Sequence, residues 1–242
     1  MKLNTLFNRN HPVVTAMLLT GTLAVMGFAG TSQTNAQTRS TTPTQTVNQS
    51  AVWAPKGNVA LTIQQACANQ GKNFTACFVN GMQRAGASSE AIAFTRSIDY
   101  MGYIQAFRPV GKVSIAVVTV PFMANENQAI YLVNGNPARM NIDDPSLLQQ
   151  NELKANPVYK QLVQKYTDVV IFPGDRRINA LRTEKLSNRG QRFVVDYKLN
   201  DRCHACPQVG TAQFAFDFDS TGRFLGTKLV NVTPLQNQTQ RR

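Results

Sequence analysis

The sequence predicts an α+β fold, with short N-terminal helices followed by a mainly antiparallel sheet that carries one inserted helical segment. Two observations predict it: apolar residues recur at helical spacing over 60–103, and from residue 112 onward β-branched and aromatic runs alternate with turn signals. The chain has 242 residues, of which 43% are hydrophobic and 16% charged, which suits a globular domain and excludes disorder throughout. No period of 20–50 residues is visible, which excludes a solenoid.

The first 36 residues have the order of a secretory signal peptide. Lys2 and Arg9 precede an apolar stretch over 13–30, and the small-residue sequence Thr34-Asn35-Ala36 follows it. The alternative is a retained membrane anchor, because 18 apolar residues approach the length that spans a bilayer. Thr, Gly and Ala dilute the stretch, however, and no basic cluster follows. We therefore expect a periplasmic or secreted protein with no transmembrane span in its mature chain.

The mature chain is expected to have three parts. Residues 37–57 are rich in Thr, Gln, Ser and Asn and predict a flexible polar linker. Residues 58–233 predict a single α+β domain, and residues 234–242 form a polar tail. Trp53, at the end of the linker, is expected to pack on the edge of the domain rather than to stack on a ligand.

Capping signals divide the helical region into three helices. Thr62 and Gln65 have the spacing of a capping box, which predicts the start of the first helix. Asn73 is expected to cap the second helix and Gly86 to end it. Ser88 is expected to cap the third.

The strand region is interrupted once by helix. Asn134-Gly135 predicts a hairpin between 128–133 and 138–142, and Asn156-Pro157 divides the helical segment 145–166 into two pieces. In 192–199 the alternation predicts Phe193, Val195, Tyr197 and Leu199 inward and Val194, Asp196 and Lys198 outward. The remaining strands are expected at 112–120, 167–172, 211–218 and 223–232, the last two joined by a turn at 219–222.

Four cysteines in an exported chain favour disulfides, although four cysteines allow three pairings. We expect Cys67 to pair with Cys77 and Cys203 with Cys206, because each pair is close in sequence. The alternative is that a cysteine of the helical region bridges to Cys203 or Cys206 and so joins the helices to the sheet.

The Cys203-His204-Ala205-Cys206 motif has three possible roles. Our expectation is a disulfide that closes a loop, because no helix follows the motif to stabilise a thiolate as in thioredoxin-like proteins. The alternative is a thiol–disulfide redox site in which Cys203 and Cys206 react and His204 tunes them. A zinc site would need a second closely spaced cysteine pair, and haem attachment would need a histidine where Pro207 stands. The sequence therefore predicts no metal and no cofactor.

A basic segment over 176–192 is the strongest charge feature of a chain whose net charge is +12. It contains one acidic residue, Glu184, and six basic residues: Arg176, Arg177, Arg182, Lys185, Arg189 and Arg192. A solvated basic face is one interpretation. The functional interpretation is a binding patch for an anionic polymer of the cell envelope or for lipid headgroups, since clustered charge concentrates counter-ions. Nucleic acid is not expected, because the chain is exported and no aromatic RNA-binding motif accompanies the charges.

The mature chain has one histidine, His204, which leaves few possible catalytic arrangements. No nucleophile elbow, zinc-protease helix or phosphate-binding loop motif is present. The sequence thus favours a non-enzymatic, basic accessory or binding protein of the cell envelope. The alternative is a redox protein that uses the Cys203–Cys206 motif.

Cleavage after Ala36 is directly testable by intact-mass analysis of protein exported by the native host. The expected mature chain begins at Gln37, because the small-residue site ends there. Recovery of exported protein that still begins at Met1 would instead support the membrane anchor.

Overall fold

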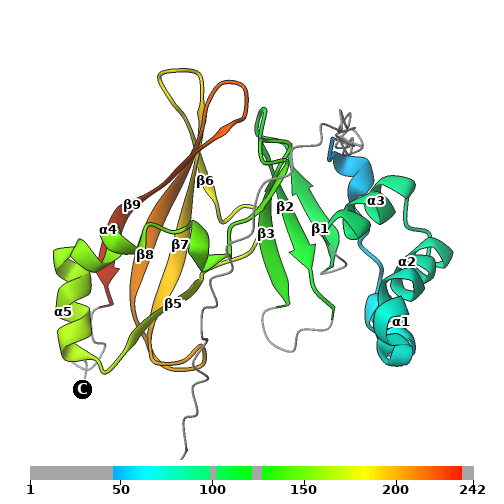
Figure 1. Ribbon diagram of the computed structural model, residues 1–242, viewed down its shortest axis with the longest axis horizontal. Helices are drawn as coiled ribbons and strands as arrows, with labels where there is room; N and C mark the ends of the chain where they lie inside the picture. The colour runs from blue at the N-terminus through cyan, green and yellow to red at the C-terminus, as the bar shows by residue number, and fades with distance from the viewer. Residues whose placement is uncertain (1–45, 99–101, 122–126, 236–242) are drawn as a thin grey trace, which may run out of the picture. The chain divides into compact units, whose positions relative to one another are not determined.

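The computed structural model describes residues 46–98, 102–121 and 127–235 (Figure 1). The predicted signal peptide, the linker up to residue 45 and the tail from residue 236 lie outside these residues. The described chain is α+β: N-terminal helices are followed by two antiparallel sheets, with a short pair of helices between the sheets in sequence. The predicted fold class is confirmed, but the strands form two sheets where the sequence analysis expected one.

The N-terminal region contains three α-helices, α1 Val59–Cys67, α2 Phe74–Arg84 and α3 Ser89–Ser97, and two short 3-10 helices, Gln49–Ala51 and Ala68–Asn73. The predicted cap of α3 is confirmed, since Ser88 Oγ accepts a hydrogen bond from the Ala91 backbone N–H at 3.0 Å. Gly86 ends α2 in the left-handed region (φ +80°). The capping box at Thr62 was wrong, because α1 already begins at Val59 and the Thr62 N–H donates to the Asn58 carbonyl within the helix.

The first sheet has the order β1-β2-β3-β4, and its strands are β1 Tyr103–Arg108, β2 Ser114–Thr119, β3 Gln128–Val133 and β4 Arg139–Asn141. The predicted hairpin is present: Asn134 adopts φ +70° and its N–H donates to the Ala138 carbonyl at the β3–β4 turn. Strand β1 was missed. Its register shifts between Ile104 and Ala106, and this bulge breaks the alternation that sequence reading relies on.

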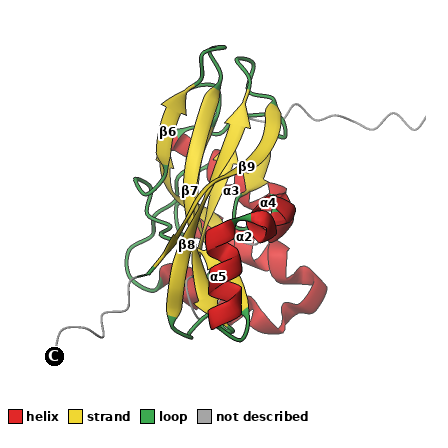
Figure 2. Cartoon of the chain, turned by 90° about the vertical axis from the view of Figure 1, so that its left-hand side faces the viewer, coloured by secondary structure: helices red, strands yellow, loops and turns green. Residues whose placement is uncertain are grey.

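The inserted helices are α4 Gln150–Ala155 and α5 Pro157–Lys165, preceded by a 3-10 turn at Pro145–Leu147. They divide at Asn156 as predicted, and the Asn156 carboxamide oxygen accepts hydrogen bonds from the first backbone N–H groups of α5. Both helices contact β9 (Phe224–Pro234), the edge strand of the second sheet, as Figure 2 shows.

The second sheet has the order β5-β7-β8-β9, with strands β5 Val169–Pro173, β7 Gln191–Asp201 and β8 Gln208–Phe218 before β9. A short strand, β6 Arg182–Lys185, pairs with the first residues of β7 and was not predicted, because its four residues are polar and largely exposed. Val194, expected to point outward, is only 4% exposed; it pairs with Arg182 of β6 on one side and with Ala215 of β8 on the other.

One apolar core joins the two sheets. Phe214, Phe216 and Phe218, which the alternation placed on one face of β8, are all fully buried. They share a cluster with residues of the first sheet such as Ile115 and Leu132. Two polar contacts reinforce this junction. The Gln191 carboxamide exchanges hydrogen bonds with the backbone of Val113 at 2.8 and 3.1 Å, and the Tyr197 hydroxyl donates to the Ile142 carbonyl at 2.5 Å.

The packed chain begins earlier than the linker boundary at residue 57. Val47, Ala51 and Trp53 are 6%, 2% and 5% exposed. The Asn134 side chain exchanges two 2.7 Å hydrogen bonds with the Val47 backbone, so this segment is anchored to the β3–β4 turn. The Trp53 ring meets Tyr103 edge-on at 4.8 Å, as expected for a residue that packs on the domain edge.

Replacing Trp53 by Ala tests whether this segment belongs to the folded domain. Loss of a buried indole should lower the free energy of unfolding by about 3–5 kcal/mol, measured by urea denaturation. The exposed neighbour Lys56 is the control, and Lys56→Ala should change stability by less than about 0.5 kcal/mol. Equal, small effects of both substitutions would mean that residues 46–57 behave as a linker.

Candidate functional site

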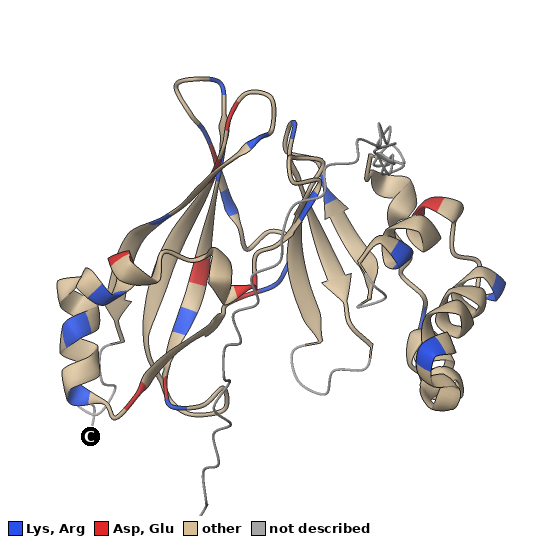
Figure 3. Cartoon of the chain, in the orientation of Figure 1, with Lys and Arg blue, Asp and Glu red and all other residues tan. Residues whose placement is uncertain are grey.

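The six cations of the basic segment lie along one edge of the second sheet, from the β5–β6 loop through β6 and its turn to the start of β7. Figure 3 shows acidic residues among the basic ones in this part of the sheet. Four of the six cations form ion pairs: Arg176 with Asp143, Arg177 with Asp175, Arg182 with Glu184, and Arg192 with Asp217. Counting only the residues of 176–192 therefore overestimates the positive charge that this edge offers to a ligand, because carboxylates from other segments neutralise part of it.

The Arg192–Asp217 pair is the best formed of these. Arg192 Nε and Nη2 donate to the two carboxylate oxygens of Asp217 at 2.7 and 2.8 Å, and Lys228 Nζ lies 3.5 Å from the same carboxylate. Burial raises the pKa of Asp217, but the hydrogen bonds from Arg192 and the charges of Arg192 and Lys228 outweigh burial and hold that pKa below its usual 3.8. Arg192 is thus committed to a structural contact.

Arg176 is also structural. Its Nε donates to Asp143 at 2.9 Å, and the two side chains are only 13% and 15% exposed. Asp143 follows β4 of the first sheet, so this pair joins the two sheets. Sequence reasoning missed Asp143 and Asp217 as partners, because they lie 33 and 25 residues from their arginines along the chain.

Three exposed cations remain around a groove of about 540 Å³. Lys185 is the last residue of β6, Arg189 comes from the β6–β7 turn, and Lys112 comes from the β1–β2 loop of the first sheet. None of the three forms an ion pair with a residue that the structure describes. Lys112 was not a candidate in the sequence analysis, since it stands alone in its loop.

The walls of the groove are held by Gln191. Its carboxamide pairs with the Val113 backbone, and a Cβ on Gly111 would lie 2.9 Å from that carboxamide, so a larger residue at this position would displace the Gln191 side chain. Val110 and Leu186 add apolar surface to the lining. The groove therefore combines three cations, a limited apolar area and the carboxylate of Glu184, which is paired with Arg182 and Arg192. This composition suits an anionic group carried on a larger molecule.

Arg189 occupies an unusual backbone position in this groove. It lies at φ +63° in the β6–β7 turn, in the left-handed region that Gly and Asn adopt most readily. Arginine adopts this left-handed conformation less readily than Asn does. The Arg189 side chain makes no ion pair within the described chain.

Both predicted disulfides are present among the described residues. Cys67 and Cys77 join α1 to α2 with a Cα–Cα distance of 5.7 Å, and Cys203 and Cys206 close the β7–β8 loop with a Cα–Cα distance of 4.9 Å. Disulfides form in oxidising compartments, so these two are consistent with a location outside the cytoplasm.

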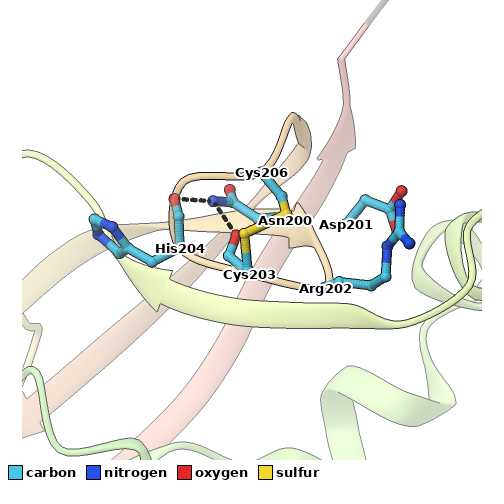
Figure 4. Close-up of a disulfide and its surroundings, with 6 residues drawn as sticks. All are labelled: Asn200, Asp201, Arg202, Cys203, His204 and Cys206. Atoms are coloured by element: carbon cyan, nitrogen blue, oxygen red, sulfur yellow. Dashed lines mark hydrogen bonds and ion pairs between the residues drawn. A yellow bond between two sulfur atoms is a disulfide. The ribbon is translucent and has the colours of Figure 1, made fainter.

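The Cys203–Cys206 loop is a strand-to-strand connection, as its sequence context indicated (Figure 4). The Asn200 side chain, from the end of β7, donates to the Cys203 and His204 carbonyls at 3.2 and 2.9 Å. The His204 ring packs edge-on against Phe172 of β5 with a centroid distance of 5.2 Å.

The turn over 219–222 is a hairpin connection, as expected. Asp219 Oδ1 accepts hydrogen bonds from Thr221 and Arg223, and the bonds from the Thr221 side chain and the Arg223 backbone lower the pKa of Asp219 to about 2. Its carboxylate oxygen closes the turn. Within the described residues, no three His, Cys, Asp or Glu side chains gather as metal ligands would.

No known protein family, curated protein or solved structure matches this chain. Across the described ranges, no helix has the length and apolar character needed to cross a membrane.

The Arg192–Asp217 pair predicts a measurable pKa change. Arg192→Gln removes the hydrogen bonds and the charge, so burial should then raise the Asp217 pKa above its wild-type value, which lies below 3.8. Carboxyl NMR titration measures this shift. At pH 7 the variant should lose about 1–3 kcal/mol of stability, because a half-buried carboxylate loses its partner.

The sign of the pH dependence follows from the lowered pKa. The wild-type contribution is complete above about pH 3.8, the usual value, and is lost as the pH falls through the lower folded-state pKa. The difference in the free energy of unfolding between the wild type and Arg192→Gln should therefore be smaller at acid pH than at pH 7. Arg182→Gln is the control, and an equal shift of Asp217 in both variants would contradict the assignment.

Proposed function

We propose that this chain is an exported, non-enzymatic binding protein of the cell envelope, whose groove at the β6–β7 turn binds anionic groups. The observation that carries the proposal is that Lys112, Lys185 and Arg189 line one groove without ion-pair partners in the described chain, while Glu184, the acidic residue of the lining, is paired with Arg182 and Arg192. The order of basic, apolar and small residues in the first 36 positions supports export to the periplasm or the exterior.

The ligand class follows from the composition of the groove. Three cations that line one groove attract phosphate, sulfate or carboxylate groups, and low-dielectric walls such as Val110 and Leu186 strengthen that attraction. An anionic envelope polymer presents such groups repeatedly, so the groove can engage it at any point along its length. Lipid headgroups carry the same charge and are the second ligand to compare.

Two matched triple variants test the proposal. The groove triple is Lys112→Gln, Lys185→Gln and Arg189→Asn, in which Asn suits the left-handed backbone. The control triple is Lys56→Gln, Lys72→Gln and Arg96→Gln, three exposed cations of the N-terminal region. Each triple removes two lysines and one arginine, so the net charge is the same in both.

The groove triple should bind heparin, a sulfated polymer, on the order of 100-fold more weakly at 0.1 M salt, at about 1 kcal/mol for each basic residue near an anionic surface. The control triple should lose less than about 5-fold. Binding by the wild type should fall as salt is raised from 0.1 to 1 M, because the Debye length shrinks from about 10 to about 3 Å. Equal losses by the two triples would mean that net charge alone attracts heparin and would refute the groove.

Vesicles of anionic and zwitterionic lipid distinguish the two ligand sources. Retention on heparin without binding to anionic vesicles supports a polymer ligand, and the reverse supports lipid headgroups. The single variant Arg177→Gln adds a second check. It should weaken binding less than Arg189→Asn, because Asp175 already neutralises the charge of Arg177.

A further inference from the structure

We propose that the Cys203–Cys206 disulfide is a thiol–disulfide exchange site that oxidises dithiols on other exported polypeptides. The inference is independent of the anion-binding groove. Its first support is the contrast between the two disulfides. Cys67 is 1% exposed and Cys77 half-buried, whereas Cys203 is exposed and Cys206 is half-buried in a surface loop. Exchange requires an attacking thiolate to reach a sulfur, and the β7–β8 loop offers that access.

The second support is that backbone hydrogen bonds shape this loop without the disulfide. The Cys206 N–H donates to the Cys203 carbonyl at 3.1 Å, and the Asp201 N–H donates to the Pro207 carbonyl at 3.0 Å. The Arg202 N–H donates to the Asp168 carbonyl at 2.7 Å, which ties the loop to the residues just before β5. The loop can therefore keep its conformation when the disulfide opens, as a site that cycles between two redox states requires.

Asn200 supplies the third support. Its side chain is 2% exposed. Figure 4 shows its amide inside the loop, where the NH₂ group donates hydrogen bonds to the Cys203 and His204 carbonyls. Its Oδ1 is buried with no hydrogen-bond partner among the described residues. A buried acceptor without a donor is costly. Opening the disulfide creates S–H donors in the same loop, which favours the dithiol state.

The reaction is a two-step exchange. A substrate thiolate attacks Sγ of Cys203, the exposed sulfur, the Cys203–Cys206 bond breaks, and Cys206 leaves as a thiolate that takes up a proton. The second substrate thiolate then attacks the substrate sulfur of the mixed disulfide and releases Cys203. The substrate loses two electrons and two protons, and Cys203 and Cys206 gain them. Exchange with a disulfide of another exported protein restores the bond by the reverse steps.

Equilibration of the oxidised wild-type protein with glutathione tests the proposal, with alkylation and peptide mass analysis to follow each pair. The [GSH]²/[GSSG] value that half-reduces Cys203–Cys206 should be at least about 100-fold lower than the value for Cys67–Cys77. The circular dichroism spectrum should be unchanged after selective reduction of Cys203–Cys206. Equal resistance of both pairs, or unfolding on reduction of Cys203–Cys206, would overturn the proposal.

A trapping experiment tests which sulfur reacts. Incubated with a synthetic peptide closed by one disulfide, the Cys206→Ala protein should form a covalent adduct through Cys203 at least about 10-fold faster than the Cys203→Ala protein does through Cys206. The matched control is Cys77→Ala, which leaves the buried Cys67 as the free thiol. It should form adduct through Cys67 no faster than Cys203→Ala does through Cys206. If Cys206→Ala reacts no faster than Cys77→Ala, the loop has no exchange role. Heparin binding by Cys206→Ala should equal that of wild type, so failure of this proposal leaves the groove proposal intact.

Discussion

The packing of the β8 phenylalanines against the first sheet is the interaction on which the rest of the structure depends. Phe214, Phe216 and Phe218 are fully buried in a cluster that includes residues of both sheets, and burial of aromatic side chains is the largest single source of stability available to such a core. This packing places β7, the neighbour of β8, so that Gln191 at one end meets the β1–β2 loop and Asp201 at the other leads into the disulfide loop. The groove and the disulfide loop thus stand at opposite ends of one strand.

The groove shows how tertiary ion pairs select the charges that remain for a ligand. Arg176 and Arg192 look equivalent to Lys185 and Arg189 in the sequence, but partly buried carboxylates hold the first two. A paired and half-buried arginine costs free energy to release, whereas an exposed lysine keeps its charge available. The charge proposed to bind a ligand is therefore a subset of the basic segment together with Lys112 from the β1–β2 loop.

The two disulfides differ in environment more than in covalent structure. Cys67–Cys77 lies between helices with one cysteine buried, where it restrains the helical hairpin. Cys203–Cys206 spans a short loop that backbone hydrogen bonds already define. On the chain-entropy model, closing four residues contributes about 2 kcal/mol and closing eleven about 3 kcal/mol, so loop length alone does not separate the roles of the two disulfides.

The sequence by itself determined the element types and the features that depend on near neighbours. The Ser88 cap, the helix division at Asn156, the inward phenylalanines of β8 and the two local cysteine pairs all follow from residues within a few positions of each other. Only the tertiary structure decided that the strands form two sheets, that Trp53 and Val47 are packed, and which cations stay unpaired. The reason is physical: periodicity and capping act over one or two turns of chain, whereas the partners of Arg192, Arg176 and Val47 lie 25, 33 and 87 residues away and meet only when the core forms.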